Sequence, residues 1–523
     1  MNRLSKLFGH HLRTENRSPP PGPQASSTFP TEADYFRHRK QRGVNLGSWF
    51  VLERWIVDSP FRSAAAPAQS DLDVARGANA KEILENHWDT WITEEDWAWL
   101  AGRGVNTVRI PVGFYHICGA DASVLPGTDF ADFQHVFEGA WSRIIGALVS
   151  AHKHGLGVLI DLHAAPGKQN ADSHSGTSSP HPAFFSKQAN MKHTIHVLST
   201  LLSHLTAFAN SHSPPLTNLV GIELLNEPQP GSHGAALEKW YLDAFHALRA
   251  IDPCVPLYIG DSWMTDQYAD FLSRSATHFA VLDHHLYRCF TSDDTSTSAT
   301  EHARRLTDPN DWTPQMFARV AQKLESAGCA LVVGEWSGAL NPGSLHAVQN
   351  EYEARRAYVT AQLQLYERYC SGWFFWTYKK GSAGDKGWSF RDAIAAGVFP
   401  ESIALKVKAA VGDDPSIATR RDAAKEKALN EHATYWKQYP GQYEHWRFGE
   451  GFIQGWDDAW TFLSASASHP GAFMQELGFK GPWAKRRAQA HAREKGEGNL
   501  WEFEHGFSQG TAAAAADFVS TYC

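Results

Sequence analysis

Two glutamates follow apolar runs in this sequence and could act together on one bond. Glu227 lies in LLNEPQ (residues 224–229) and Glu335 in VVGEWSG (residues 332–338), 108 residues apart. Two carboxyl groups flanking an acetal can break it, because one protonates the leaving oxygen while the other attacks the anomeric carbon or activates water. Either glutamate alone is better explained as an ordinary strand-end carboxylate. The pair, in these settings, favours glycoside chemistry.

Eight segments with strand character recur along the chain, mostly separated by stretches of helix length. They are residues 43–47, 105–111, 157–163, 219–228, 255–261, 279–285, 330–336 and 372–378. Several are nearly continuous apolar runs, as in parallel strands that are buried on both faces. Helices are expected between them, for example at residues 94–102, 140–154, 235–250 and 351–369. This alternation predicts an α/β fold, a (β/α)8 TIM barrel.

Each predicted strand ends in a polar or aromatic side chain. These are Asn45, Arg109, His163, Asn226 with Glu227, Asp261, His285, Glu335 and Trp376. The active site of a (β/α)8 barrel is built at the carboxyl ends of its strands, so these side chains would converge on one mouth. A single such residue would be ordinary, but a complete set indicates an active site.

The motifs that contain these residues resemble glycoside hydrolase family 5. In chain order they are RGVNLGSWFVLERWI, GVNTVRIPVGFYHI, GLGVLIDLHAAPGKQN, VGIELLNEPQ, VLDHHLYRCF, VVGEWSGAL and GWFFWTYKK with a later GWSF. Within the family they are most similar to the fungal exo-β-1,3-glucanases, the glucan 1,3-β-glucosidases. The resemblance runs from about residue 40 to residue 403 and is weak only at the fifth strand.

This resemblance implies a retaining, two-carboxylate mechanism that removes terminal β-D-glucosyl residues. Glu227 would be the general acid/base and Glu335 the nucleophile. Asn226 would bind the sugar 2-OH, and Tyr287 would orient Glu335. Arg109 would favour the ionised nucleophile, although a purely structural ion pair is the alternative for this residue.

The resemblance also implies which further residues bind the sugar. Glu53 would grip the non-reducing glucose, and Trp376 would form the stacking floor of the −1 subsite. His163 and His285 would bind hydroxyl groups or tune the carboxylates, and Phe290 would contact the leaving-group sugar. Independently of the resemblance, His284 is expected to support or pack against site residues, and Glu223 to be a buried strand carboxylate paired with a basic neighbour, not a third catalytic acid.

The sequence departs from the secreted relatives at the acceptor side. Those enzymes carry an aromatic residue shortly after their HGAPGSQN-like loop, whereas HAAPGKQNADSHSG places Asp172 there. Phe290, the second aromatic of that acceptor clamp, is present, and Leu286 replaces a third histidine in DHHLY. We therefore expect glucose recognition like that of the family and a different acceptor preference.

Composition excludes several classes of protein. A net charge of −8 and a pI near 6.4 argue against a nucleic-acid partner. No run approaches the roughly 18–20 apolar residues of an integral membrane segment. Most of the 20 Trp are expected in the core, with stacking on sugar faces as the alternative for the others. The 27 His show no HExxH-like spacing, so neither a metal nor another cofactor is expected.

Three regions are predicted along the chain. Residues 1–40 read as a disordered, basic and Pro-rich tail, with a mitochondrial presequence as the alternative. Residues 41–411 form the catalytic barrel, and residues 412–523 form a Trp-rich helical extension. In this extension Ile453, Trp456, Trp460 and Leu463 have helical spacing and are expected to pack against the barrel, with a partner surface as the alternative.

The residues leave several questions open. No secretory signal of about 7–15 apolar residues begins the chain, which favours a cytoplasmic protein. The substrate could be a β-glucoside or glucan oligosaccharide, or a glycolipid such as glucosylceramide or a steryl glucoside bound with help from the Trp-rich extension. A catalytically inactive sugar-binding protein is the alternative from another class. The oligomeric state and any pairing of the six cysteines are undetermined.

Overall fold

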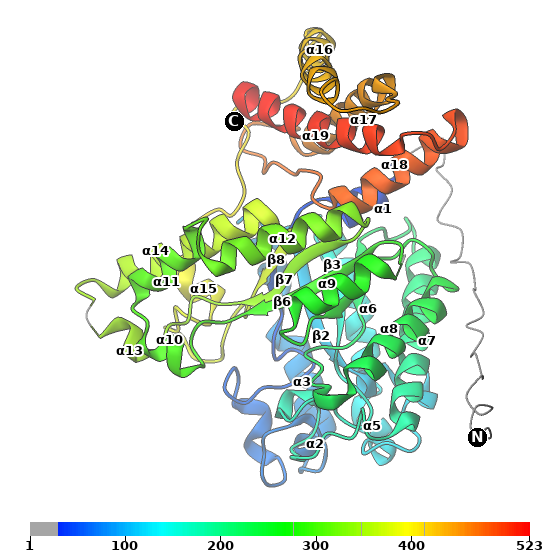
Figure 1. The fold of residues 1–523 in the computed structure, drawn as a ribbon. Coiled ribbons are helices and arrows are strands. Elements are labelled where there is room, and N and C mark those ends of the chain that lie inside the picture. The colour runs from blue at the N-terminus through cyan, green and yellow to red at the C-terminus, as the bar shows by residue number, and fades with distance from the viewer. Residues whose placement is uncertain (1–29, 276, 347, 413) are drawn as a thin grey trace, which may run out of the picture.

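Eight parallel strands close into a barrel in the order β1 to β8, which confirms the predicted fold (Figure 1). The computed structural model describes residues 30–275, 277–346, 348–412 and 414–523. The strands are β1 (Gln41–Asn45), β2 (Thr107–Gly113), β3 (Gly157–Ala164), β4 (Leu219–Glu223), β5 (Leu257–Gly260), β6 (Ala280–Leu286), β7 (Ala330–Trp336) and β8 (Gly372–Phe375). The sheet closes where β1 pairs with β8, with Val44 opposite Phe375. Every strand residue is buried, because the barrel interior and the surrounding helices cover both faces.

Helices surround the barrel and extend beyond it. Around the barrel lie α1 (Glu32–His38), α2 (Asp71–Ala75), α3 (Ala80–Trp91), α4 (Glu94–Ala101), α5 (Gln134–Phe137), α6 (Ala140–Lys153), α7 (Gln188–Ser211), α8 (Gly234–Arg249), α9 (Thr265–Arg274), α10 (Ser292–Ser296), α11 (Ala299–Thr307), α12 (Trp312–Ser326), α13 (Pro342–Leu345), α14 (Glu351–Tyr369) and α15 (Phe390–Ala395). The extension comprises α16 (Ile417–Trp436), α17 (His445–Ser466), α18 (Lys480–Lys495) and α19 (Leu500–Tyr522). We keep residues 41–411 and 412–523 as the proposed bounds of the two parts.

Two predicted boundaries differ from the structure. Residues 1–29 of the predicted disordered tail lie outside the described residues, but residues 32–38 form helix α1, so the prediction is wrong there. Thr31 begins this helix with a capping box, in which its side chain and that of Asp34 bind each other's backbone N–H. Strand β4 ends at Glu223 rather than at residue 228, so Glu227 lies beyond the strand.

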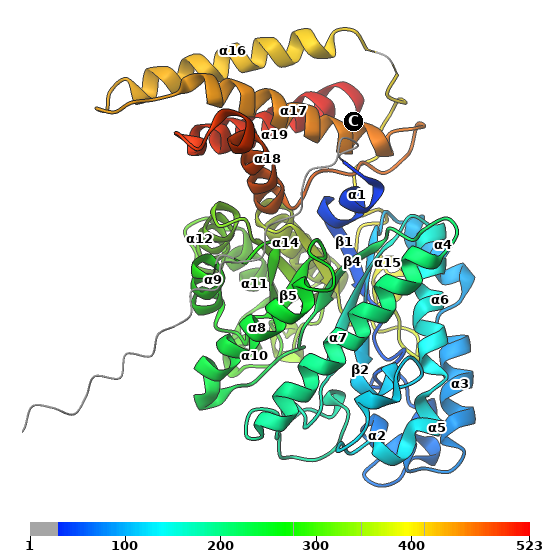
Figure 2. The same cartoon turned by 90° about the vertical axis from the view of Figure 1, so that its right-hand side faces the viewer.

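The extension closes the end of the barrel from which the strands start. Phe479 and Phe36 pack against inward-facing residues near the beginnings of the strands, among them Val220 and Phe374. The backbone N–H of Lys40, next to β1, donates to the carbonyl of Glu476 at 2.8 Å. Figures 1 and 2 show α16–α19 stacked at this one end of the barrel. The mouth at the carboxyl ends of the strands, where the predicted site residues lie, is therefore at the other end.

Helices α17 and α19 run parallel at very close range. A Cβ atom added to Gly451 or Gly455 of α17 would lie 2.1 or 2.2 Å from a backbone oxygen of α19. Gly506 and Gly510 of α19 face the backbone of α17 in the same way, at 2.0 and 2.1 Å. Each helix thus carries two glycines four residues apart at the contact. Small residues at this spacing allow two helix backbones to approach closely.

The apolar stripe of α17 packs inside the extension. Trp456, Trp460 and Leu463 form a core with Phe518 and Tyr522 of α19, and Trp460 meets Phe518 edge to face at 5.0 Å between ring centroids. The prediction that this stripe packs against the barrel is therefore wrong. The spacing does correspond to a helix, but the stripe is buried by parallel packing of α17 against α19.

Two further features concern the whole chain. Within the described ranges, no helix combines the length and the apolar character needed to cross a membrane. All six cysteines are unbridged.

The glycine contact can be tested with Gly455→Ala. The new methyl group would meet the backbone oxygen of Phe507, so we expect unfolding to become easier by about 1–3 kcal/mol, the usual cost of overpacking. Urea unfolding followed by Trp fluorescence measures this. The control is Gly449→Ala on the same helix, where the nearest atom would be 3.7 Å away. Because Ala is the better helix former, this control should be neutral or stabilising; equal losses for both variants would contradict the close-approach explanation.

Candidate active site

The two predicted catalytic glutamates meet at the mouth of the barrel. Glu335 lies on β7, and Glu227 follows β4 with a φ of +42°. A residue other than glycine rarely adopts this left-handed conformation, which is typical of functional sites held in place by their surroundings. Here the holding contact comes from Asn170, whose side-chain amide donates to the Glu227 carbonyl at 3.1 Å.

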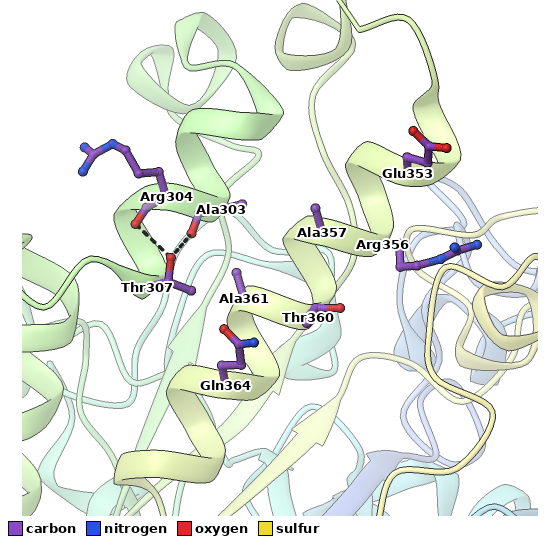
Figure 3. A pocket seen from close by; sticks show the side chains of 9 residues that line it. All are labelled: Ala303, Arg304, Thr307, Glu353, Arg356, Ala357, Thr360, Ala361 and Gln364. Atoms are coloured by element: carbon purple, nitrogen blue, oxygen red, sulfur yellow. Dashed lines mark hydrogen bonds between the residues drawn. The ribbon is translucent and has the colours of Figure 1, made fainter.

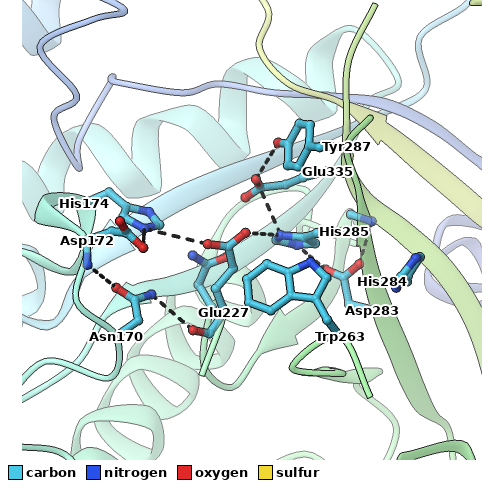
Figure 4. Close-up of polar contacts among 12 residues, drawn as sticks. Asn170, Asp172, His174, Glu227, Trp263, Asp283, His284, His285, Tyr287 and Glu335 are labelled. Atoms are coloured by element: carbon cyan, nitrogen blue, oxygen red, sulfur yellow. Dashed lines mark hydrogen bonds and ion pairs between the residues drawn. The ribbon is translucent and has the colours of Figure 1, made fainter. Parts of the chain in front are cut away.

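Oxygens of the two carboxyl groups lie within 4.8 Å of each other, with His285 between them. His285 Nδ1 lies 2.7 Å from Glu227 Oε1 and 3.5 Å from Glu335 Oε2 (Figure 4). Its surroundings, Glu335, Asp283 and Glu227, raise the pKa of His285 well above its usual value despite burial. The imidazolium therefore reduces the repulsion between two adjacent carboxylates.

Glu335 is held at both of its oxygens. Arg109 Nη1 donates to Oε1 at 2.9 Å, and the Tyr287 hydroxyl donates to Oε2 at 2.8 Å. Burial raises the pKa of Glu335 above its usual value, while His285, Arg109 and Tyr287 oppose the rise. These contacts place Arg109 and Tyr287 where the sequence predicts them, and both favour the carboxylate form.

Arg109 also joins several strand ends. Its side chain is fully buried and forms ion pairs with Glu223 at 2.7 Å and with Asp161 at 3.1 Å, in addition to Glu335. It donates to the side-chain oxygen of Asn226 at 2.8 Å as well. The expected pairing of Glu223 with a basic neighbour is confirmed. The same guanidinium group of Arg109 therefore forms structural ion pairs with Glu223 and Asp161 and also contacts Glu335.

The pKa of Glu227 is lowered to about 2, although the carboxyl group is buried. Burial raises this pKa, but the hydrogen bond from His285 and the charges of His285, His174 and His163 outweigh it. A carboxyl group with this pKa is ionised at neutral pH.

The predicted sugar-binding residues surround this pair. Trp376 stacks on His163 with centroids 5.7 Å apart and rings almost parallel, at 6°. Glu53 accepts a hydrogen bond from Trp55 Nε1 at 2.7 Å, and burial, reinforced by Glu335 and Glu227, raises its pKa to about 7. Aromatic and carboxyl groups of this kind can hold the faces and hydroxyl groups of a sugar.

An aromatic rim lies on the side of Tyr287. Phe290 is 72% exposed and packs near Tyr287 and Trp388, with centroid distances of 5.6 and 6.0 Å. Trp55 meets Trp388 at 5.2 Å. These four rings form a partly exposed aromatic rim beside the two carboxyl groups.

Asp261 lines the same hollow as Glu227 and His285, and His284 lies behind it. His284 Nδ1 lies 2.7 Å from Asp261 Oδ2, which also accepts from Thr265 at 2.6 Å. His284 therefore supports Asp261, which agrees with the supporting or packing position expected for it. Asp261 converges with Glu227 and His285 as the sequence predicts, although its carboxylate also takes part in this local network.

Comparison with known proteins identifies the group to which this sequence belongs. The profile of cellulase (glycosyl hydrolase family 5) matches residues 75–382, more than half of the chain. The chain belongs to glycosyl hydrolase family 5. The profile of the glucan 1,3-beta-glucosidase 3 C-terminal domain matches residues 417–518, which lie in the extension. The protein is therefore a glycosidase with an additional C-terminal domain.

Relatives in this family cover most of the chain. Glucan 1,3-beta-glucosidase 3 of Schizosaccharomyces pombe is 31% identical over 91% of this chain and 95% of its own length. The probable glucan 1,3-beta-glucosidase A of Aspergillus fumigatus is 30% identical over 69% of this chain and 88% of its own. The crystal structure of a rutinosidase from Aspergillus niger superposes with a TM-score of 0.55 at 21% identity, over 70% of this chain and 99% of that one. That likeness concerns the fold.

Sequence reasoning missed several residues of this family 5 site. Trp263 follows β5, where the resemblance is weak, and has a φ of +56° and half of its side chain exposed beside Glu227 and His285 (Figure 4). A Trp two residues after the strand-end Asp261 could have indicated it. His174 was missed as well, although its loop had been noted for Asp172.

Two other places among the described residues have side chains that are already engaged with one another. A groove between α11 and α14 is lined by Ala303, Arg304, Thr307, Glu353, Arg356, Ala357, Thr360, Ala361 and Gln364 (Figure 3). Its Thr307 hydroxyl already donates to helix carbonyls. In the extension, His432, His445 and Glu502 could hold a metal ion, but both imidazoles lie within 2.9 Å of Glu502 Oε2 in a hydrogen-bonded network.

The contact between Tyr287 and Glu335 can be tested with Tyr287→Phe. Loss of the hydroxyl should lower kcat/KM about 10- to 100-fold, since a hydrogen bond to a charged group contributes about 1.5–3 kcal/mol. It should also raise the pKa of Glu335, because the Tyr287 hydrogen bond lowers it, and thus move the acid limb of the pH profile to higher pH. Tyr358→Phe on α14, a buried tyrosine away from the mouth, is the control. An unchanged acid limb in Tyr287→Phe would contradict the assignment.

Proposed function

We propose that this chain is a retaining, exo-acting β-glucosidase or β-1,3-glucanase that hydrolyses terminal β-D-glucosyl residues by double displacement. The observation that carries the proposal is the approach of the Glu227 and Glu335 oxygens to within 4.8 Å. Retaining glycosidases hold their two carboxyl groups about 5–5.5 Å apart, whereas inverting enzymes need about 6.5–9.5 Å to accommodate a water molecule.

In the first step Glu335 attacks the anomeric carbon while Glu227 protonates the leaving oxygen. The double contact from Arg109 and Tyr287 aims the Glu335 carboxylate. Asn226 is fixed by Arg109 and would bind the sugar 2-OH, a contact that strengthens as the oxocarbenium-like transition state forms. In the second step Glu227 takes a proton from water, which releases glucose from Glu335 with retained configuration.

Glucose recognition would fall to the residues around this pair. Trp376 would stack against the apolar face of the sugar at the −1 subsite. Glu53, His163 and His285 would bind the hydroxyl groups of that sugar. Phe290 and Trp388 would contact the acceptor sugar. The two relatives, a glucan 1,3-beta-glucosidase and a probable glucan 1,3-beta-glucosidase, support a β-1,3-linked glucose unit as the substrate.

The alternative substrates are less well supported. A glycolipid was considered because the Trp-rich extension could have formed an apolar acceptor groove. The extension instead packs at the barrel end opposite the mouth, where Phe479 contacts the starts of the strands. An inactive sugar-binding protein is disfavoured because both carboxyl groups keep their surrounding hydrogen bonds.

Glucose release from a substrate panel tests the proposal. The panel contains laminaritriose, cellobiose, gentiobiose, an aryl β-glucoside and glucosylceramide. We expect laminaritriose to be preferred, and Glu335→Gln to lower turnover by several orders of magnitude, since it removes the nucleophile. Glu238→Gln, on the outer helix α8, is the matched control and should keep full activity. Proton NMR of the first product should show β-glucose.

Three results would each contradict a different part of the proposal. Initial release of α-glucose would contradict retention and the role of Glu335. Preference for glucosylceramide would move the enzyme to glycolipid turnover. Binding of laminaritriose without turnover between about pH 4 and pH 8 would favour the inactive sugar-binding protein.

A further inference from the structure

His174 and Asp172 lie at the second oxygen of Glu227, in the loop that follows β3. His285 contacts Oε1 of Glu227, whereas His174 Nε2 faces Oε2 at 3.7 Å (Figure 4). The same nitrogen lies 3.7 Å from Asp172 Oδ2. The His174 side chain is 14% exposed and that of Asp172 is 61% exposed. A largely covered imidazole therefore stands between the proposed acid/base carboxyl and a carboxylate at the surface.

A chain of hydrogen bonds fixes which nitrogen of His174 carries a proton. His163 Nδ1 lies 2.6 Å from Asp161 Oδ2, which is ion-paired with Arg109, so this nitrogen donates. His163 Nε2 is then an acceptor, and His174 Nδ1, at 2.9 Å, must donate to it. The remaining nitrogen of His174, Nε2, is the one whose proton can be gained or lost. That nitrogen faces Glu227.

The loop that carries His174 is fastened to the segment of the acid/base residue. Gln169 Nε2 donates to the carbonyl of Asn226 at 3.0 Å, and Asn170 Nδ2 donates to the carbonyl of Glu227. The Asn170 side-chain oxygen accepts from the backbone N–H of Asp172 at 3.0 Å. These hydrogen bonds between side chains and backbone hold the loop that carries His174 next to Glu227.

The charged groups that face His174 favour its cationic form. They are Asp172 on its own loop, Glu227 after β4 and Glu53 after β1. The imidazole of His163 on β3 accepts a hydrogen bond from the Nδ1–H of His174. Burial lowers the pKa of His174, but the three carboxylates raise it to about 9. The neighbouring Glu227, with a pKa near 2, is ionised.

We propose that His174 stores the proton that Glu227 delivers to the leaving group, and that Asp172 retains this proton on the imidazole between turnovers. This inference rests on the proposed glycosidase function. His174 acts through Glu227 and does not contact the scissile bond. The 3.7 Å separation closes to a hydrogen bond by a small movement, as is usual for catalytic contacts before substrate binds.

The proton balance closes over one turnover. As the leaving group engages, the Nε2–H bond of His174 breaks and an O–H bond forms at Glu227 Oε2. That proton passes to the glycosidic oxygen as its bond to the anomeric carbon breaks. In the second step Glu227 removes a proton from the attacking water, and this proton returns to His174 Nε2. The net reaction is hydrolysis, and no co-reactant is consumed.

The alkaline limb of the pH profile distinguishes proton storage from a simple effect of charge. When Glu227 and His174 share a proton, the limb reports the pKa of the pair. In His174→Asn, Glu227 must hold the proton alone beside the cationic His285, so the limb should move to lower pH by about one unit or more. If His174 served only as a fixed cation, its removal would raise the pKa of Glu227 and move the limb to higher pH. An unchanged limb would also overturn the proposal.

The experiment measures kcat/KM of the full-length chain against pH with laminaribiose, whose leaving group needs protonation. A dinitrophenyl β-glucoside, whose leaving group does not, should be cleaved by His174→Asn within a few-fold of the wild-type rate. Asp172→Asn, at a largely exposed position, should move the limb in the same direction by a smaller amount. His181→Asn, an exposed histidine of a nearby loop, is the matched control and should leave the profile unchanged.

Two further measurements separate the possible failures. Nitrogen-15 chemical shifts of His174 should report an imidazolium at pH 7.5, and a neutral ring would overturn the inference independently of activity. If the wild type cleaves no glucoside at all, the proposed function fails. A second outcome is that the wild type is active, Glu335→Gln is inactive, and His174→Asn leaves the alkaline limb unchanged. In that case only the present inference fails.

Discussion

The buried charge of Arg109 is the constraint on which the mouth of this barrel depends. A guanidinium group with no exposure must be surrounded by carboxylates and acceptors, because an unpaired buried charge is costly. Glu223, Asp161 and Glu335 supply the charges from β4, β3 and β7, and Asn226 supplies a further oxygen. Because Arg109 on β2 also donates to Asn45 of β1, one side chain joins five strands to the segment before Glu227. Catalytic geometry and local stability are consequently inseparable at this point.

Much of this arrangement could be predicted from the sequence. The apolar runs located all eight strands, because parallel strands buried on both faces leave a strong pattern. The residues at the strand ends then indicated the mouth, and the resemblance assigned Glu227 and Glu335. Asp261 shows the limit of this reasoning: it lines the same hollow as Glu227 and His285, but its carboxylate is hydrogen-bonded to His284 on the next strand. Position at a strand end does not reveal which partner a side chain finds.

The remaining differences arise from contacts between distant parts of the chain. Nothing in the α17 stripe indicates whether it faces the barrel or α19, because helical spacing gives a direction but not a partner. Helix α1 was missed because the Pro-rich segment before it suggested disorder as far as β1. His174 lies in a loop without periodicity, and only the positions of His163 and Glu227 give it meaning.

The extension covers the end of the barrel where the strands begin, and this affects how the chain folds during synthesis. Arg42, at the start of β1, forms ion pairs with Glu367 of α14 and with Glu476, 434 residues later in the sequence. During synthesis on the ribosome, the strands would emerge long before the segment that contains Glu476 and Phe479. Contacts between residues so distant in sequence form slowly, because a large loop must close first. Until the segment around Phe479 has been synthesised, apolar residues at the beginnings of the strands stay exposed. Molecular chaperones would be most needed during this interval.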